Sequence, residues 1–303
     1  MPLNLQAWWA MLKQMAGSWL ADYAPSMGAA LAYYTLFSLA PLLLIVIAVA
    51  GLVFGEDAAR GEVTAQLSAL MGTGGAQAVQ GLLASVDKPA EGAVATVLGV
   101  VLLFVGATTV FGELQDALDR IWRAPTPSRT LGWFGLVRAR LLSFGMILAI
   151  GFLLTVSLVL SATLSLLGRW LEPVFGGWLA VASAGSAIGG FVLVAVTFAL
   201  IYKVMPRVRV QWKDVWIGAL FTAVLFTLGK SLIGFYLGRS GVVSGFGAAG
   251  SLVVVLLWVY YSAQIFLIGA EFTWAYANAF GSRRPAALPG PSRAGPPLGP
   301  SMG

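Results

Sequence analysis

The sequence has no cysteine and no histidine. These absences exclude a disulfide framework, a thiol nucleophile and a zinc site built from cysteine and histidine. The lack of histidine also removes the commonest general base near neutral pH. The remaining residues form no arrangement typical of a hydrolytic site. We therefore expect no catalytic residue, no bound metal, no cofactor and no enzyme activity.

Charge is also scarce, since charged residues make up 10% of the chain whereas hydrophobic residues make up 59% and the mean hydropathy is +0.87. Such a chain cannot cover itself with a polar surface, so it must use lipid as its solvent. Apolar blocks long enough to cross a hydrocarbon core of ~30 Å recur along it. The sequence therefore predicts an all-α, polytopic membrane protein with six transmembrane helices, at residues 28–54, 92–111, 141–167, 178–202, 215–237 and 250–279.

Lysine and arginine are unevenly distributed between the loops that join these blocks. If the N-terminus is cytoplasmic, 13 of the 18 basic residues fall on the cytoplasmic side. Membrane proteins carry this excess in their cytoplasmic loops, so we expect both termini in the cytoplasm. The net charge of +6 then reflects cations that touch anionic lipid head groups rather than a nucleic-acid partner.

Two terminal segments flank the transmembrane domain at residues 28–280. In residues 1–27, an apolar stripe at helical spacing predicts an amphipathic helix over residues 4–23, with Trp8, Leu12, Met15, Trp19 and Tyr23 on the stripe. This helix either lies in the membrane interface or packs on the cytoplasmic ends of the bundle. Residues 281–303 are rich in proline, glycine and serine, which predicts a disordered cytoplasmic tail.

The loops between the blocks also contain helical patterns. In residues 55–91, two short amphipathic stripes separated by Gly72, Gly74 and Gly75 predict two short helices that cap the extracytoplasmic face. A re-entrant hairpin is the alternative. Residues 113–123 predict a cytoplasmic helix that Pro125 and Pro127 end. The short connection between the blocks at 141–167 and 178–202 predicts an antiparallel pair.

The first block carries polar residues and a proline. Proline removes one backbone hydrogen bond and kinks a helix, so we expect a bend at Pro41. The bend either serves packing alone or opens a broken helix that lines a cavity. Tyr33, Tyr34 and Thr35 precede it on the same block.

Lys230 and Glu271 are the two charges that lie clearly within apolar sequence. A charge at the bilayer centre costs about 2.5–3.5 kcal/mol on insertion scales. The helical rise places them at opposite ends of the bundle, so we expect no direct pair. Lys230 either snorkels outward or lines an outward-facing pocket that attracts an anionic group.

Glu271 lies at the expected depth of the cytoplasmic helix. It either joins a structural ion-pair network there, with Glu113, Asp116, Arg120 and Arg123, or forms an inner gate or proton site. Tyr260, Tyr261 and Gln264 stand between the two charges of the last blocks. The sequence thus predicts a polar substrate path or gate that comprises Lys230, Glu271, Gln264, Tyr260, Tyr33, Tyr34, Thr35 and Pro41.

Three segments carry a family resemblance: AALAYYTLFSLAPLL at residues 29–43, LQDALDRIW at 114–122 and LWVYYSAQIFLIGAEF at 257–272. Their order and spacing, over about residues 15–280, resemble the YihY/BrkB family of bacterial inner-membrane proteins, formerly mislabelled ribonuclease BN. The resemblance implies six transmembrane helices with both ends in the cytoplasm. Proposals for the family centre on envelope lipid handling and serum resistance, and the residues give the ribonuclease label no support.

Two functions fit these observations. The first is a transporter or lipid translocator for envelope lipids or other anionic amphiphiles. The second is a non-catalytic scaffold that recruits envelope proteins through the cap at 55–91 and the helix at 113–123. Membrane lipids are expected partners in both cases, and the sequence does not give the oligomeric state.

Overall fold

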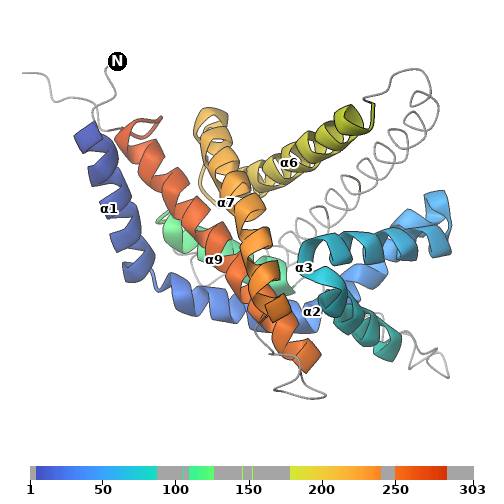
Figure 1. The fold of residues 1–303 in the computed structure, drawn as a ribbon. Coiled ribbons are helices and arrows are strands. Elements are labelled where there is room, and N and C mark those ends of the chain that lie inside the picture. The colour runs from blue at the N-terminus through green and yellow to red at the C-terminus, as the bar shows by residue number, and fades with distance from the viewer. Residues whose placement is uncertain are drawn as a thin grey trace, which may run out of the picture.

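A computed structural model describes residues 5–86, 105, 109–125, 145, 152, 178–239 and 250–284. In this part of the chain every named element is a helix (Figure 1). The helices are α1 (Leu5–Ala21), α2 (Ala24–Phe54), α3 (Glu56–Val86), α6 (Trp178–Val204), α7 (Trp212–Arg239) and α9 (Gly250–Ala279). Residues 109–121 are also helical. The all-helical expectation is therefore confirmed for the described residues.

Three of these helices are long and apolar enough to cross a membrane, at Ala187–Val204, Trp212–Tyr236 and Leu252–Ala279. A fourth span is possible if the two bent halves of α2 form one crossing. Most of the blocks expected at 92–111 and 141–167 lies outside the described residues. The short connection expected between the blocks at 141–167 and 178–202 lies outside them as well. Six crossings and the antiparallel pair therefore remain predictions.

Helices α7 and α9 pack side by side and run in opposite directions (Figure 1). Small residues allow this contact, because a methyl group at Gly218 would collide with Thr273 on α9 and one at Gly269 would collide with Thr222 on α7. Helix α6 packs against α7 and contacts α9 through Tyr202. The Tyr202 hydroxyl is fully buried and donates to the Phe266 carbonyl oxygen at 2.8 Å.

Helix α2 is bent where the proline predicts a bend. Its segments Ala24–Ala40 and Leu42–Leu52 are inclined at 43° to each other, and the break falls at Pro41. The helix begins at Ala24, four residues earlier than the apolar block suggests, directly after Tyr23 in the left-handed conformation. Pro25 stands in the first turn, where its missing N–H costs no helical hydrogen bond.

Helix α3 is helical from Glu56 to Val86, but it is not straight. The Gln80 side-chain amide donates to the Thr64 hydroxyl at 3.0 Å. In a straight helix sixteen residues span ~24 Å, so the chain must fold back between these positions, as Figure 1 shows. Both arms bury apolar side chains against α2 and α9. This agrees with two short helices separated at the glycines, while their place on the extracytoplasmic face remains a prediction.

Helix α1 packs along the C-terminal half of α9 (Figure 1). Met11 is buried with Phe272 and Ala275, and Trp8 stacks on Phe280 with ring centroids 5.1 Å apart. Of the two sequence interpretations, this contact favours a helix packed on the bundle. The opposite face of α1, with Leu5 and Trp9, is exposed.

The segment after α9 is fixed in place for a few residues beyond the expected boundary. The Ser282 hydroxyl and backbone N–H donate to the buried carboxylate of Asp214 at the start of α7. The Arg283 guanidinium lies 5.0 Å from the centre of the Trp122 ring. These contacts attach the described residues up to Arg284 to the bundle, while the disordered tail predicted from residue 281 stays a prediction. Residues 285–303 lie outside the described residues.

Candidate functional site

The first turns of α2 lie between α9 and the helical segment at 109–121. On one side, Gly28 lies against Gln264 and Tyr260 of α9, and the Gln264 amide donates to the Ala24 carbonyl oxygen at 3.4 Å. On the other side, α2 faces helix 109–121 across a pocket of about 440 Å³. A methyl group at position 28 would overlap the Gln264 amide as it is placed here, so any side chain there would displace that amide.

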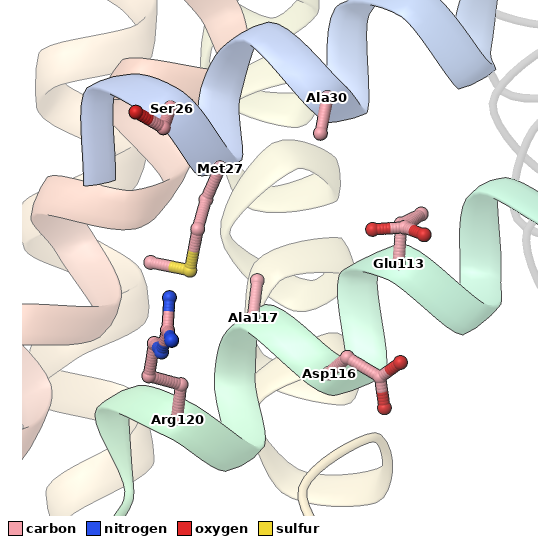
Figure 2. Close-up of a pocket in the computed structure, with 7 residues that line it drawn as sticks. All are labelled: Ser26, Met27, Ala30, Glu113, Asp116, Ala117 and Arg120. Carbon is pink, nitrogen blue, oxygen red and sulfur yellow. The ribbon is translucent and has the colours of Figure 1, made fainter. Parts of the chain in front are cut away.

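The pocket combines charged and apolar lining residues (Figure 2). Met27 reaches from α2 toward Arg120, and the Glu113 carboxyl points toward α2 near Ala30. Asp116 points away from α2 along the outer side of its helix. The complete lining is Ser26, Met27, Ala30, Glu113, Asp116, Ala117 and Arg120.

The charges of the pocket are unequally compensated. Burial raises the pKa of Glu113 above its ordinary value, and the negative charge of Asp116 raises it further. Asp116 is exposed and lies 3.9 Å from the Arg207 guanidinium. Arg120 lies 5.9 Å from the centre of the Tyr23 ring, at the entry to α2. Glu113 and Arg120 are therefore the charged groups that face the space beside α2.

A second set of contacts attaches helix 109–121 to the loop between α6 and α7. The Arg207 backbone N–H donates to Asp119 Oδ1 at 2.7 Å, and the Arg207 guanidinium lies 3.3 Å from Asp119 Oδ2. The Gln115 amide donates to the Met205 carbonyl oxygen at 3.0 Å. Burial raises the pKa of Asp119, and the Arg207 backbone N–H and guanidinium oppose this shift. These contacts hold helix 109–121 firmly beside the pocket.

The helix at 109–121 ends in a Schellman motif whose left-handed residue is Arg123, at φ 53°. The Arg123 and Ala124 N–H groups bond back to the carbonyls of Arg120 and Asp119. The helix thus ends ahead of Pro125, as the sequence predicts. Tyr23, at φ 58°, is the corresponding left-handed residue between α1 and α2. Left-handed backbone is costly for residues other than glycine, so surrounding contacts must hold both turns.

An ion pair joins these two turns. Arg123 Nη1 donates to Asp22 Oδ1 at 2.5 Å, and the Asp22 side chain is almost fully buried. The Arg123 guanidinium also lies 5.5 Å from the centre of the Trp274 ring on α9. Glu271, one turn before Trp274, is fully buried and interacts electrostatically with both Asp22 and Arg123. The α1–α2 junction, helix 109–121 and α9 therefore meet at one acidic centre.

The structure brings together only part of the expected ion-pair network. Arg123 lies with Glu271, whereas Glu113, Asp116 and Arg120 line the pocket on the far side of α2's first turns. The five side chains expected in one network therefore form two neighbouring clusters, Glu271 with Arg123 and the three charged residues of the pocket. They are separate because Gly28 and Ala24 place α2 directly against α9, between the pocket and Gln264.

The expected polar path is likewise divided. Gln264 and Tyr260 lie on the α2-facing side of α9, but Tyr261 faces Gly229 of α7. Tyr33 is 56% exposed, and its ring meets that of Tyr34 edge-on and that of Phe37 at a tilt, while Thr35 is half-buried. Tyr33 therefore lies on the outer side of α2.

Lys230 is exposed on α7, beside the exposed apolar side chains of Leu228 and Leu232. Its neighbour Gly229 contacts Tyr261, while Gly218, near the start of α7, contacts Thr273. Lys230 and Glu271 therefore lie at different levels of the bundle, as the helical rise predicts. The exposed position favours the interpretation that Lys230 snorkels.

Sequence reasoning missed Asp22, Asp119 and Arg207. Asp22 had a detectable signal, because it is the single acidic residue in the first 55 positions and precedes the first apolar block directly. Asp119 and Arg207 are 88 residues apart, and no local pattern connects them. In the described part of the chain, no three acidic side chains gather as metal ligands would.

Comparison with known proteins identifies the family. The family described as virulence factor BrkB matches residues 15–292. A UPF0761 membrane protein of Pseudomonas paraeruginosa is 31% identical over 260 residues, which cover 84% of this chain and 60% of the relative. One from Azotobacter vinelandii is 30% identical, with 88% and 62% covered. The chain thus spans about three fifths of the length of these relatives. No solved structure matches it. The family match over nearly the whole chain shows that this protein belongs to the BrkB family of membrane proteins.

Proposed function

We propose that this protein is a transporter that moves amphiphiles with a charged head group, such as envelope lipids, across the bacterial inner membrane. The observation that carries this proposal is the charged pocket between α2 and helix 109–121, beside a bent apolar helix. A lipid head group needs charged partners, and the first carbons of its chains need apolar ones. The pocket lining offers both kinds of surface.

Each side of the pocket has a role in this proposal. The Arg120 guanidinium suits a phosphate group because its donors match phosphate oxygens in pairs. Met27, Ala30 and Ala117 would contact the apolar part of the amphiphile next to the head group. The Glu113 carboxyl repels an anion when ionised, and its raised pKa reduces that repulsion. From the positive-inside distribution of lysine and arginine, we expect this pocket on the cytoplasmic side.

Leaflet exchange of a fluorescent anionic phospholipid in proteoliposomes tests the proposal. Wild-type protein should accelerate exchange over protein-free liposomes. Arg120→Gln should slow it about tenfold or more, since a hydrogen bond to a charged group contributes about 1.5–3 kcal/mol. Lys230→Gln is the matched control, because it removes an exposed cation on α7 that does not line the pocket, and it should exchange lipid as the wild type does.

Three outcomes would contradict the proposal. Equal rates for wild type and Arg120→Gln would exclude the pocket as the head-group site. Equal losses in both variants would show that net charge rather than position matters. No exchange by folded, inserted wild-type protein would exclude lipid translocation and favour a scaffold that acts through helix 109–121 and the segment at 55–91.

A further inference from the structure

Glu271 is a buried acid to which no described residue donates a hydrogen bond. Its side chain is 0% exposed, neither carboxyl oxygen accepts a hydrogen bond, and its side-chain contact is with a second carboxylate, that of Asp22. Buried polar groups are almost always hydrogen-bonded, so each exception needs an explanation. An isolated buried carboxylate is especially costly, and such groups usually take up a proton instead.

The groups around Glu271 do not supply a compensating charge. Among the described residues, Arg123 is the single cation that interacts with it, and the Arg123 hydrogen bond is directed to Asp22. Asp22 is itself an acid at 5% exposure, and its second oxygen Oδ2 has no partner in the described structure. Two carboxylates and one guanidinium leave the group one negative charge in excess when both acids are ionised.

Within the part of the chain that the structure describes, the other elements that pack near Glu271 present no further charge to it. Helix α7 faces this part of α9 with Gly218 and Thr222, and α6 contributes the Tyr202 hydroxyl. Helix α2 contains no charged residue at all. The charged groups that act on Glu271 are therefore Asp22 from the α1–α2 junction and Arg123 from the turn after helix 109–121.

A proton fits this site better than a metal ion. Calcium and magnesium take six or more oxygen ligands and use water for those that the protein does not supply. Asp22 and Glu271 offer at most three free carboxyl oxygens, and burial of both side chains keeps water from completing such a shell. One proton on either carboxyl removes the excess charge and supplies a donor for the other. Two carboxyl groups that share one site behave in this way, because neighbouring like charges resist joint ionisation.

We propose that Asp22 and Glu271 together form a binding site for a single exchangeable proton at the junction of α1, α2 and α9. The proton forms an O–H bond with one carboxylate and is donated to the other, so the charge of the Asp22–Arg123–Glu271 group changes from −1 to 0. Arg123 is half-exposed and marks the side from which a proton reaches the pair. This proposal does not depend on which molecule the protein transports.

Infrared spectroscopy of the purified, folded protein tests the proposal without any lipid-transport assay. A protonated carboxyl group has a carbonyl stretch distinct from that of a carboxylate. Wild-type protein at pH 7 should show this band, which should shift in D₂O and disappear as the pH is raised. Glu271→Gln should remove it, and Asp22→Asn should change its frequency because the hydrogen-bond partner changes. Glu56→Gln, which alters an exposed acid on α3, is the control and should leave it unchanged.

The proposal is overturned if wild-type protein at pH 7 shows no protonated-carboxyl band, or if the band is the same in Glu271→Gln and wild type. The wild-type measurement alone decides the first point, so it does not depend on how well the variants fold. If the infrared result excludes the proton site while the protein still exchanges lipid, the proposed function stands. If the protein exchanges no lipid while the infrared band is present, the proton site stands.

Discussion

At the scale of single residues, glycine and threonine determine how closely α7 and α9 approach. Gly269 lies against the hydroxyls of Thr222 and Tyr202, which are 3.1 Å apart and buried. Thr222 in turn donates to the Gly218 carbonyl oxygen at 2.7 Å. Close backbone approach with hydroxyl hydrogen bonds is typical of helix packing in lipid, where no hydrophobic force drives helices together.

Gly269→Ala should therefore destabilise the protein by about 1–3 kcal/mol, the usual cost of overpacking a well-packed core. The added methyl group would collide with both hydroxyls and separate α7 from α9. Thermal unfolding in detergent measures the effect. Gly234→Ala is the matched control, because Gly234 on α7 has open space around it and alanine is the better helix former. Equal melting temperatures for the two variants would contradict this packing.

Some residue-level features could be predicted from the sequence and others could not. Glu271 is conspicuous because a charge in apolar sequence is rare and costly. Its partner Asp22 is distant along the chain, and the turn at Tyr23 that presents it has no glycine to mark it. A side chain's burial and partners depend on tertiary contacts, which no local pattern records.

At the scale of elements, the local sequence pattern of α3 predicts its break but not its depth in the membrane. Three glycines at 72, 74 and 75 predict a break, and the contact between Gln80 and Thr64 shows that the chain folds back there. The depth of this segment relative to the membrane cannot be read from the same pattern, because its glycine and alanine residues suit a cap and a re-entrant hairpin equally.

Because the chain has no native cysteine, paired cysteines test this fold directly. Thr64→Cys with Gln80→Cys should be joined by a short bifunctional thiol reagent that forms disulfides with both cysteines, detected as a mobility shift that reductant reverses. Glu56→Cys with Gln80→Cys should not, since Glu56 lies ~12 Å further along the first arm. A straight α3 would separate Thr64 and Gln80 by ~24 Å, so failure of the first pair to crosslink would contradict the folded-back arms.

The helix at 109–121 illustrates the opposite case. Its existence and its end before Pro125 follow from charged residues after an apolar block and from the prolines behind it. The packing of this helix in the fold does not follow from the sequence, because Asp119 and Gln115 attach it to the α6–α7 loop through residues far away along the chain. These anchors place Glu113 and Arg120 beside α2.

At the scale of the whole molecule, composition predicts the helical membrane architecture because lipid leaves few alternatives for backbone hydrogen bonds. Hydropathy also predicts α6, α7 and α9 closely, since their apolar stretches are long and uninterrupted. It does not predict how the helices group, since lipid-facing and helix-facing side chains are similarly apolar. The position of α2's first turns between α9 and helix 109–121 therefore emerges from the structure alone.

The central claim is that a head group enters the pocket between α2 and helix 109–121. Cysteines at two adjacent positions of α2 test it, because Ala30 lines the pocket whereas Ala29 is exposed outside its lining. A bulky, membrane-impermeant thiol reagent should stop lipid exchange by Ala30→Cys and leave exchange by Ala29→Cys unchanged. Labelling of both cysteines with equal effect on exchange, or with no effect on either, would contradict the claim.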